Sequence, residues 1–270
     1  MSSAKDPEIA HKFMRASDYE DAIGRHVISM PKLDGLRCMW IPDKGFFSRD
    51  GKRWNDSVLA HIKPDVSVCL DGELYLHGMR LQDINSQVGV NRINPGPSAT
   101  DIKFIVYDLP DSKNKGLERM LDLSKLKFGD NVSVIDWLVF RSQSDLDAAY
   151  DNLTKLGYEG QMLKSIYGAY INQGKNKQRT INLQKRKLFM DDEFKCIGVS
   201  KGEGRCKDMT GALKFVTSAG IEFEVGTGFT DAERIDWLAH PPIDCIATIK
   251  YLYLTKDGRP FNASFKQFNY

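Results

Sequence analysis

The chain has 270 residues, 41% of them hydrophobic and 27% charged, with a formal net charge of +2. This composition is that of an ordinary globular protein large enough for one or two domains, which excludes a disordered chain. A net charge so close to zero also excludes a protein that is basic all over, so any nucleic-acid surface must be a local patch.

The start of the chain and its cysteines bear on the compartment. No apolar run reaches membrane-spanning length, and the first residues lack the apolar core of a secretion signal. The five cysteines are odd in number and scattered without metal-site spacing, and the five histidines form no metal pattern either. We therefore expect free thiols, a reducing compartment and a cytoplasmic protein without a membrane partner.

Residues 27–41 are predicted to form a strand, a turn and a second strand around Lys32. The lysine amine is a candidate nucleophile, Gly35 would let the backbone approach a ligand closely, and Arg37 would hold a phosphate. The alternative is an ordinary surface turn built on the Asp-Gly pair that follows the lysine. Only motifs further along the chain decide between these two interpretations.

Two more short motifs follow. Residues 45–51 predict a strand that runs into a tight turn, with Arg49 at its end as a phosphate contact or a solvated surface residue. Residues 66–70 predict a short apolar strand that ends in an Asp-Gly-Glu sequence. A carboxylate such as Glu73, fixed beside a glycine at a strand edge, suits a ribose hydroxyl or a hydrated metal.

The middle of the chain contains a buried strand and a clear helix. Residues 103–109 predict the strand, on which Tyr107 is either a core residue or a stacking platform for a base. The helix covers 144–156, with Ser144 as its N-cap, one apolar face, and a glycine at its end. We expect that helix to be purely structural.

A basic segment comes next. Residues 159–164 predict a strand that starts at Glu159 and ends at Lys164, and another strand is expected over 183–188. Between Lys164 and the end of that second strand there is no acidic residue, and the basic residues are Lys175, Lys177, Arg179, Lys185, Arg186 and Lys187. A solvated face normally mixes both signs, so an anionic partner explains the segment better. Period-two alternation would place the two lysines of the second strand on one face.

After Phe189 the pattern changes to short alternating strands. The acidic run 191–193 is a candidate hinge, and glycine-rich turns separate the strands expected at 194–199, 212–217, 221–225 and 246–254. About eighty residues of this kind predict a small closed β-barrel, for which the five-stranded oligonucleotide-binding (OB) barrel is the usual choice. The predicted fold class is therefore α+β. It has a domain of antiparallel sheets and helices at 1–188 and an OB-fold β-barrel at 189–270.

In order and spacing, these motifs resemble the covalent nucleotidyltransferases, and among them the minimal two-domain ATP-dependent DNA ligases of bacteria and phages. The likeness covers nearly the whole chain, from Lys-x-Asp-Gly-x-Arg at 32–37 to the barrel sequences at 209–213, 225–231 and 254–258. A single Lys-x-Asp-Gly would be weak evidence, whereas the ordered set is specific. The resemblance implies a nucleotidyltransferase (adenylation) domain followed by an OB domain.

By that resemblance, Lys32 attacks the α-phosphate of ATP and becomes linked to AMP. Lys185 and Lys187 would supply the cationic field that activates the amine and neutralises the phosphate. The residues that the resemblance assigns to nucleotide binding are Lys32, Arg37, Arg49, Glu73, Tyr107, Lys164, Lys185 and Lys187. Glu73 and Glu159 match metal-binding carboxylates, with Mg²⁺ as the expected ion and Mn²⁺ as a substitute.

The implied partner is nicked double-stranded DNA, in repair or replication within a bacterial cell or a phage-infected one. The AMP would pass to the 5′-phosphate of the nick, and the 3′-hydroxyl would displace it and seal the strand. A monomer is expected to contact the DNA through Arg37, Arg49, Lys175, Lys177, Arg179 and Arg186. Only thirty-one residues precede Lys32, so we expect the two domains to bind DNA unaided, with steep salt dependence.

One feature departs from the family, and two alternatives stay open. Related ligases carry arginines near the C-terminus, whereas Arg259 and Lys266 are the only cations after Gly258, which predicts weak self-adenylation or its dependence on other residues. The lysine motif is expected to react with the nucleoside triphosphate and does not identify the nucleic acid that accepts the nucleotide. An RNA ligase or an mRNA-capping guanylyltransferase is therefore the first alternative. The second is a non-catalytic oligonucleotide-binding relative. The sequences around Glu159 and in the barrel favour a DNA ligase.

Overall fold

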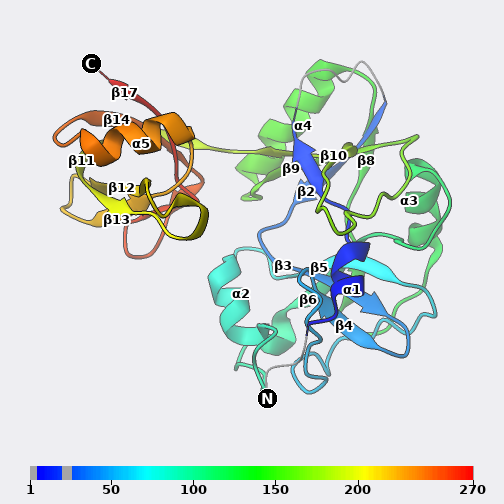
Figure 1. Cartoon of the computed structure of the whole chain (residues 1–270). Helices are drawn as coiled ribbons and strands as arrows, with labels where there is room; N and C mark the ends of the chain where they lie inside the picture. The colour runs from blue at the N-terminus through cyan, green and yellow to red at the C-terminus, as the bar shows by residue number, and fades with distance from the viewer. Residues whose placement is uncertain (1–4, 20–25, 270) are drawn as a thin grey trace. The chain divides into compact units, whose positions relative to one another are not determined.

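The computed structural model describes residues 5–19 and 26–269 (Figure 1). Contacts along the backbone divide the chain into two compact units, Met1–Lys187 and Leu188–Tyr270. No helix among the described residues is long and apolar enough to cross a membrane.

The first unit is built on two five-stranded sheets in its described part. One sheet has the order β1-β10-β9-β2-β8, and in it only β1 and β10 are parallel neighbours. Its strands are β1 (Ala16–Asp18), β2 (Val27–Lys32), β8 (Leu138–Phe140), β9 (Gly160–Ser165) and β10 (Thr180–Lys187). The other sheet has the order β4-β3-β5-β6-β7, and only β6 and β7 are parallel neighbours there. Its strands are β3 (Leu36–Ile41), β4 (Gly45–Ser48), β5 (Leu70–Tyr75), β6 (Lys103–Asp108) and β7 (Val132–Val134).

Four α-helices accompany the two sheets in the described part of this unit: α1 (Pro7–Lys12), α2 (Leu81–Val88), α3 (Gly116–Lys125) and α4 (Gln143–Lys155). Helix α3 buries Met120 and Leu123 in the main hydrophobic core, where they join residues of β5 and β6. Helix α4 packs on the first sheet through Leu146, which meets Val27 and Leu163. These apolar contacts hold both sheets in place around the segment that links β2 to β3.

The predicted strand, turn and strand around Lys32 are confirmed, and they connect the two sheets. Strand β2 ends at Lys32 in the first sheet, and β3 begins at Leu36 in the second. The glycine of the motif is required by close approach, because a Cβ on Gly35 would lie 2.4 Å from the carbonyl oxygen of Leu74. The lysine therefore lies where the chain crosses from one sheet to the other.

Two local predictions need correction. The strand predicted at 66–70 in fact starts at Leu70 and contains the whole Asp-Gly-Glu sequence, because β5 pairs with β3 on one side and β6 on the other. The acidic motif is thus in the middle of a central strand and does not end one. Helix α4 starts one residue earlier than predicted, because the Ser142 side chain, and not that of Ser144, accepts the hydrogen bond from the backbone NH of Asp145.

The second unit is an antiparallel five-stranded sheet in the order β13-β12-β11-β14-β17. Its strands are β11 (Met190–Lys201), β12 (Thr210–Val216), β13 (Glu222–Val225), β14 (Ile246–Tyr251) and β17 (Ser264–Asn269). A short hairpin of β15 (Tyr253–Leu254) and β16 (Pro260–Phe261) and a helix, α5 (Asp231–Ala239), complete the described elements. Its core is aromatic and includes Phe194, Phe215, Trp237 and Phe265.

This unit has the strand set expected of an OB domain, but no continuous strand ladder closes it into a barrel. Strand β13 ends at Val225, and the described residues record one backbone hydrogen bond across the gap to β17, from Phe265 N to Thr227 O. The acidic run 191–193 is not a break either, since it lies inside β11 and pairs with β14. Lys266 binds Asp191 at 2.8 Å and Asn269 donates to Glu193 at 2.7 Å, so partners across the sheet accommodate these acids.

Candidate active site

Three strand ends bring Lys32, Glu159 and Lys187 together. Glu159 immediately precedes β9, which lies between β2 and β10, the strands that end in the two lysines. The Lys32 ammonium binds one oxygen of the Glu159 carboxylate, and the Lys187 Nζ is 2.6 Å from the other. Glu159 is 8% exposed and each lysine 17%, so one carboxylate bridges two amines with little solvent between them.

A glycine makes this junction possible. Gly160 pairs with Lys32 on one side and with Lys187 on the other. Its φ is +150°, and a Cβ there would lie 2.1 Å from the carbonyl oxygen of Arg186. Any larger residue would therefore push β10, and Lys187 with it, away from β9.

Lys32, Glu159 and Lys187 form a charged triad, and burial and charge shift the pKa values of Glu159 and Lys187. Burial alone would raise the pKa of Glu159, but the two adjacent ammonium groups outweigh it and hold that pKa below its ordinary value. Burial, and then the charge of Lys32, lower the pKa of Lys187 despite the attraction of Glu159. Asp34, which lies near the triad, has its pKa raised, mainly by burial.

Lys32 and Lys187 line a cleft of about 270 Å³ in the first unit. Its apolar lining is suited to a flat base and consists of Met14, Ala16, Met30, Pro31, Leu33, Ile135, Met162 and Leu183. Basic side chains outnumber acidic ones in the lining: Arg15, Lys32, Arg37, Arg49, Lys164, Arg179, Lys185 and Lys187 against Asp71, Glu73 and Asp108. A cleft of this composition is suited to an anionic ligand that also has an apolar part.

A larger hollow of about 480 Å³ lies elsewhere in the unit, beside Trp40 and Trp54. Among the described residues, three aspartates line it, whereas Lys63 is the one basic residue in its lining. An acidic rim of this kind disfavours a phosphate, so the smaller basic cleft is the better candidate for a nucleotide.

The side chains of Glu73 and Tyr107, on the neighbouring strands β5 and β6, are in contact. The Tyr107 hydroxyl donates to the Glu73 carboxylate at 3.3 Å. Burial raises the pKa of Glu73 to about 7, against the opposing effect of Lys32 and Arg37. Glu73 is thus an acid of the cleft whose charge changes near neutral pH.

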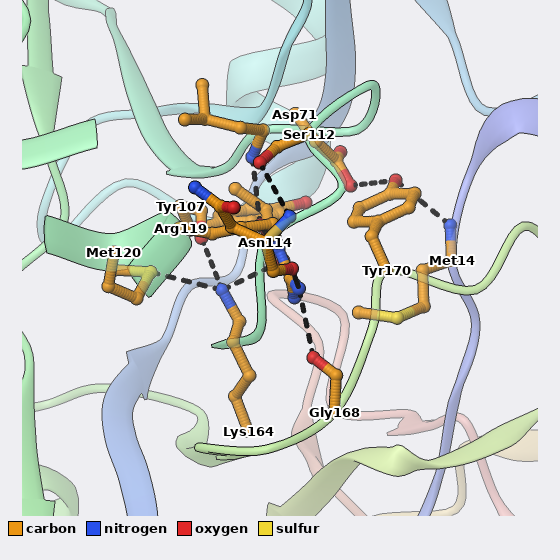
Figure 2. A network of polar contacts seen from close by, with 12 residues as sticks. Met14, Asp71, Tyr107, Ser112, Asn114, Arg119, Met120, Lys164, Gly168 and Tyr170 are labelled. Carbon is orange, nitrogen blue, oxygen red and sulfur yellow. Dashed lines mark hydrogen bonds and ion pairs between the residues drawn. The ribbon is translucent and has the colours of Figure 1, made fainter. Parts of the chain in front are cut away.

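Arg37 lines the cleft, but other groups hold most of its donors. It makes two hydrogen bonds to Asp71, at 3.1 and 2.6 Å, and a third to the carbonyl oxygen of Met14. The Tyr170 hydroxyl donates to the same aspartate at 2.7 Å (Figure 2). The Arg37 guanidinium also lies 5.8 Å from the centre of the Tyr107 ring. Arg37 therefore fixes one wall of the cleft.

Lys164 is held in a buried network behind the cleft (Figure 2). Its amine binds Asp108 at 2.9 Å and donates to the carbonyl oxygen of Tyr107 at 2.6 Å. Arg119 binds the same aspartate at 2.7 Å and donates to the carbonyl oxygens of Asn114 and Gly168. The side chains of the three charged residues are at most 2% exposed. Lys164 thus anchors the backbone of the strand that carries Tyr107.

The basic segment divides between the two faces of β10. Lys185 lines the cleft and binds Asp18 at 3.0 Å. Arg186 faces the other way, where it binds Asp147 at 2.6 Å and its guanidinium lies 4.1 Å from the centre of the Tyr150 ring. Arg49 and Arg179 are exposed residues that line the cleft, while Lys175 and Lys177 are exposed outside its lining.

The sequence-based prediction did not include Asp71, Asp108, Arg119 or Tyr170. Arg119 has a recognisable signal, because it occupies a position in the buried stripe of α3 with Gly116, Met120 and Leu123, where an arginine needs a buried acid. Asp108 has a weaker signal, as the last residue of a strand whose alternate residues are buried.

Metal ligands are sparse here. No group of three or more histidine, cysteine, aspartate or glutamate residues is placed to hold an ion anywhere in the described chain. Both oxygens of Glu159 already bind lysines, whereas Glu73 has the Tyr107 contact. An ion such as Mg²⁺ accepts as few as one or two protein carboxylates and takes its other ligands from phosphates and water, so Glu73 is chemically suited to be a ligand.

Comparison with known proteins gives one family match and several relatives. Residues 201–268 match the family model of the DNA ligase OB-like domain. A DNA ligase of Haemophilus influenzae is 27% identical over 240 residues, which cover 87% of this chain and 83% of that protein. The DNA ligase of African swine fever virus (strain Badajoz 1971 Vero-adapted) is 30% identical over 161 residues, but these cover 56% of this chain and only 36% of the viral protein.

The solved structures agree. A Lig E DNA ligase, described as binding DNA with a minimal scaffold, has a TM-score of 0.81 and 27% identity, and the match covers 95% of this chain and 98% of that one. The Chlorella virus DNA ligase-adenylate shares the fold at a TM-score of 0.51 and 19% identity, over 97% of this chain and 99% of that one. With its two units, its basic cleft and these relatives, the chain is similar to the minimal two-domain ATP-dependent DNA ligases, in which an OB domain follows a nucleotidyltransferase domain.

Proposed function

We propose that this chain seals nicks in duplex DNA, at the expense of ATP, through an AMP bound covalently to Lys32. The observation that carries the proposal is the arrangement of Lys32, Glu159 and Lys187 at a basic cleft with an apolar lining. It joins a candidate nucleophile, a group that orients it and a cation for the developing phosphate charge.

In the first step, the neutral Lys32 amine attacks the α-phosphorus of ATP. A phosphorus–nitrogen bond forms, the bond to the bridging oxygen breaks, pyrophosphate leaves with its electron pair, and the proton that the nitrogen loses passes to water. Glu159 accepts an N–H of Lys32 and so directs the amine lone pair into the cleft. Lys185 and Lys187 offset the negative charge that grows on the phosphate in the transition state.

The nucleotide would be held by the other cleft residues. The apolar side chains around Met30 and Met162 and the Tyr107 ring offer surfaces for adenine, and Glu73 offers an acceptor for a ribose hydroxyl. Arg49 is an exposed cleft residue and so a candidate for a phosphate contact, whereas Arg37 and Lys164 support the walls from their ion pairs. Mg²⁺, held by Glu73 together with phosphate oxygens, would supply further charge neutralisation, and Glu159 could join it only by releasing one of its two lysines.

Two further steps complete the reaction. An oxygen of the 5′-phosphate at the nick attacks the α-phosphorus, the bond to Lys32 breaks, and the amine regains a proton. The 3′-hydroxyl then attacks the activated 5′-phosphate, and AMP leaves as the strand is sealed. Lys175, Lys177 and Arg179 are the candidates for contacts with the DNA backbone, and since one chain supplies the whole cleft, we propose that a monomer acts on each nick.

Mass spectrometry of the intact chain tests the first step. After incubation with ATP and Mg²⁺ we expect an increase of one AMP on the wild type and none on Lys32→Arg, which keeps the charge but is not a nucleophile. A matched control, Lys125→Arg, alters an exposed lysine on α3 and should label normally. Labelling of Lys32→Arg, or no labelling of the wild type, would contradict the proposal.

Substrate choice needs a second test, because a guanylyltransferase or an RNA ligase would use the same lysine. We expect labelling with ATP and not with GTP, and sealing of a nicked DNA duplex in preference to the same nick in RNA. Labelling by GTP, or sealing of RNA alone, would transfer the proposal to one of those enzymes.

A further inference from the structure

We propose that Cys196 and Cys245 are an oxidation site of the second unit, in which a cross-strand disulfide forms by reaction with a small disulfide. The two thiols are free in this structure. Cys196 lies in β11, and Cys245 immediately precedes β14. These two strands are far apart in the sequence and are neighbours in the sheet.

Strand register places the two residues opposite each other. In the antiparallel pair of β11 and β14, Phe194 lies opposite Ala247 and Lys195 opposite Ile246. The next pair in that register is Cys196 and Cys245, and the backbone NH of Cys196 does donate to the carbonyl oxygen of Cys245 at 2.8 Å. Residues opposite each other in an antiparallel ladder have Cα atoms about 4.5–5.5 Å apart, a separation that disulfides can bridge, and this pair directly continues that ladder.

Alternation places both side chains on the same face. Phe194 and Ala247 are buried, whereas Lys195 and Ile246 are exposed, so the inner face of the sheet carries every second residue. Cys196 is two residues after Phe194, and Cys245 is two residues before Ala247. Both sulfurs therefore belong to the inner face, where Cys196 is completely buried and Cys245 partly so.

A bulge limits this pairing on the far side. Asp244 has a φ of +66°, and its NH donates to the carbonyl oxygen of Cys196 at 2.9 Å. Two residues, Asp244 and Cys245, thus oppose the single residue Cys196, which is the arrangement of a β-bulge. The bulge ends the strand pair next to the thiols, so the partly exposed Cys245 lies at the end of the ladder.

The chemistry needs one co-reactant. The Cys245 thiolate attacks a sulfur of a low-molecular-weight disulfide, which releases one thiol and leaves a mixed disulfide. The Cys196 thiolate then attacks the Cys245 sulfur and releases the second thiol. Two protein thiols are oxidised and one disulfide is reduced to two thiols, so atoms and electrons balance. Burial raises the pKa of the Cys196 thiol, which fits its role as the second reactant.

The other three cysteines are not placed for this reaction. Cys38 and Cys69 belong to the first unit, where both are buried and burial raises the pKa of each. Cys206 belongs to the second unit but lies in the short 3₁₀ turn Gly204–Cys206, outside β11 and β14. It is partly exposed, so it is the natural control.

Peptide mapping without reduction, after the full chain is incubated with oxidised glutathione, tests the proposal. We expect one linked pair of peptides, containing Cys196 and Cys245, and a mass lower by two hydrogens that dithiothreitol restores. Cys206→Ser should still form the link, and Cys245→Ser should not. Titration across glutathione buffers should give a single two-electron transition for the wild type and for Cys206→Ser.

Three results would overturn the inference. They are glutathione retained on Cys245 without a link to Cys196, a link that includes Cys206, and five unmodified thiols at every ratio of oxidised to reduced glutathione. Mapping of the wild type reports each of them without any substitution, so a variant that fails to fold cannot obscure the outcome. The AMP-labelling reaction belongs to the first unit, and we expect it to be unchanged in the linked protein.

Discussion

Lys32 and Lys187 bind opposite oxygens of the single Glu159 carboxylate, although they come from strands that do not pair with each other. Strand β9 lies between them. Glu159 immediately precedes this strand, and its first residue, Gly160, lets the three strands approach one another. The carboxylate thus sets the spacing between a candidate nucleophile and the cation next to it.

We expect Glu159→Gln to slow AMP labelling by on the order of 100-fold, the usual effect of losing one preorganised charged group in an active site. The amide keeps the shape but cannot neutralise two ammonium groups, so the lysines would repel each other and lose their orientation. Quenched-flow labelling with radioactive ATP measures the rate. Asp122→Asn, which disrupts an exposed pair with Lys125, is the control and should label at the wild-type rate.

Glu73 should make both activity and stability depend on pH. The pKa of Glu73 is raised to about 7, so the folded state keeps a proton that the unfolded state loses near pH 4.5. Between these values the folded state binds more protons, so the free energy of unfolding should fall as the pH rises. Urea titrations from pH 5 to pH 8 measure this slope, and Glu73→Gln should reduce it.

The same group predicts the pH dependence of labelling. If an ionised Glu73 serves the nucleotide or its metal, the rate of AMP labelling in wild type should rise as pH increases through about 7. In Glu73→Gln that inflection should disappear and the overall rate should be lower. An inflection that persists unchanged in the variant would assign it to another group.

Gly160→Ala adds only one methyl group but should be severely destabilising. The added Cβ would collide with the carbonyl oxygen of Arg186, so β10 must move and the Lys187 contact with Glu159 must lengthen. We expect a loss of about 3 kcal/mol in the free energy of unfolding, at the upper end for overpacking, and little AMP labelling. Gly198→Ala is the control, because its nearest neighbour would be an ordinary 3.5 Å contact.

Arg119→Met tests the buried network behind the cleft. Removing one partner of a buried ion pair leaves Asp108 with one cation fewer and should cost about 3–5 kcal/mol in urea unfolding. Lys125→Met, on the exposed surface of the same helix, should cause no measurable loss. A loss as small for Arg119→Met as for that control would show that the network contributes little.

The triple change of Lys175, Lys177 and Arg179 to glutamine should weaken binding to nicked duplex. If each residue neutralises one phosphate, the slope of log Kd against log salt should fall by about three. Arg186→Gln is the matched control from the same segment, because Arg186 already binds Asp147 and stacks on Tyr150. If Arg186→Gln lowers the slope by about one, a third of the fall expected from the triple variant, Arg186 contacts the DNA as well.

The sequence predicts the residues that line the cleft better than the buried residues that support them. Alternation on β10 correctly places Lys185 and Lys187 on one face, which the structure shows to line the cleft, because side-chain direction in a strand is a local property. Arg119 and Asp108 meet only after α3 packs on the second sheet, and no local pattern reports that contact. Helix α5 was not predicted, because only strands were expected after Phe189. It nevertheless has a local signal in the capping box of Thr230 and Glu233.

The barrel shows the same limit. Four of its strands are predictable from alternation and glycine-rich turns, although β11 is longer than expected because its acids find partners on β14 and β17. The final strand, β17, has mixed burial and gives no clear pattern. Whether the ladder closes depends on the lengths of β13 and the turn after it, which are tertiary properties.

The interlocked charges of Asp108, Lys164 and Arg119 also constrain how this protein can be re-engineered. Each of the three residues comes from a different segment. Replacing one of them alone by a neutral residue leaves a buried charge without one of its partners. A chimera that takes α3 from one ligase and β9 from another would mismatch them even where every individual segment is compatible. Grafts of the cleft should therefore transfer these segments as one cassette, or replace all three charges together with apolar residues of similar volume.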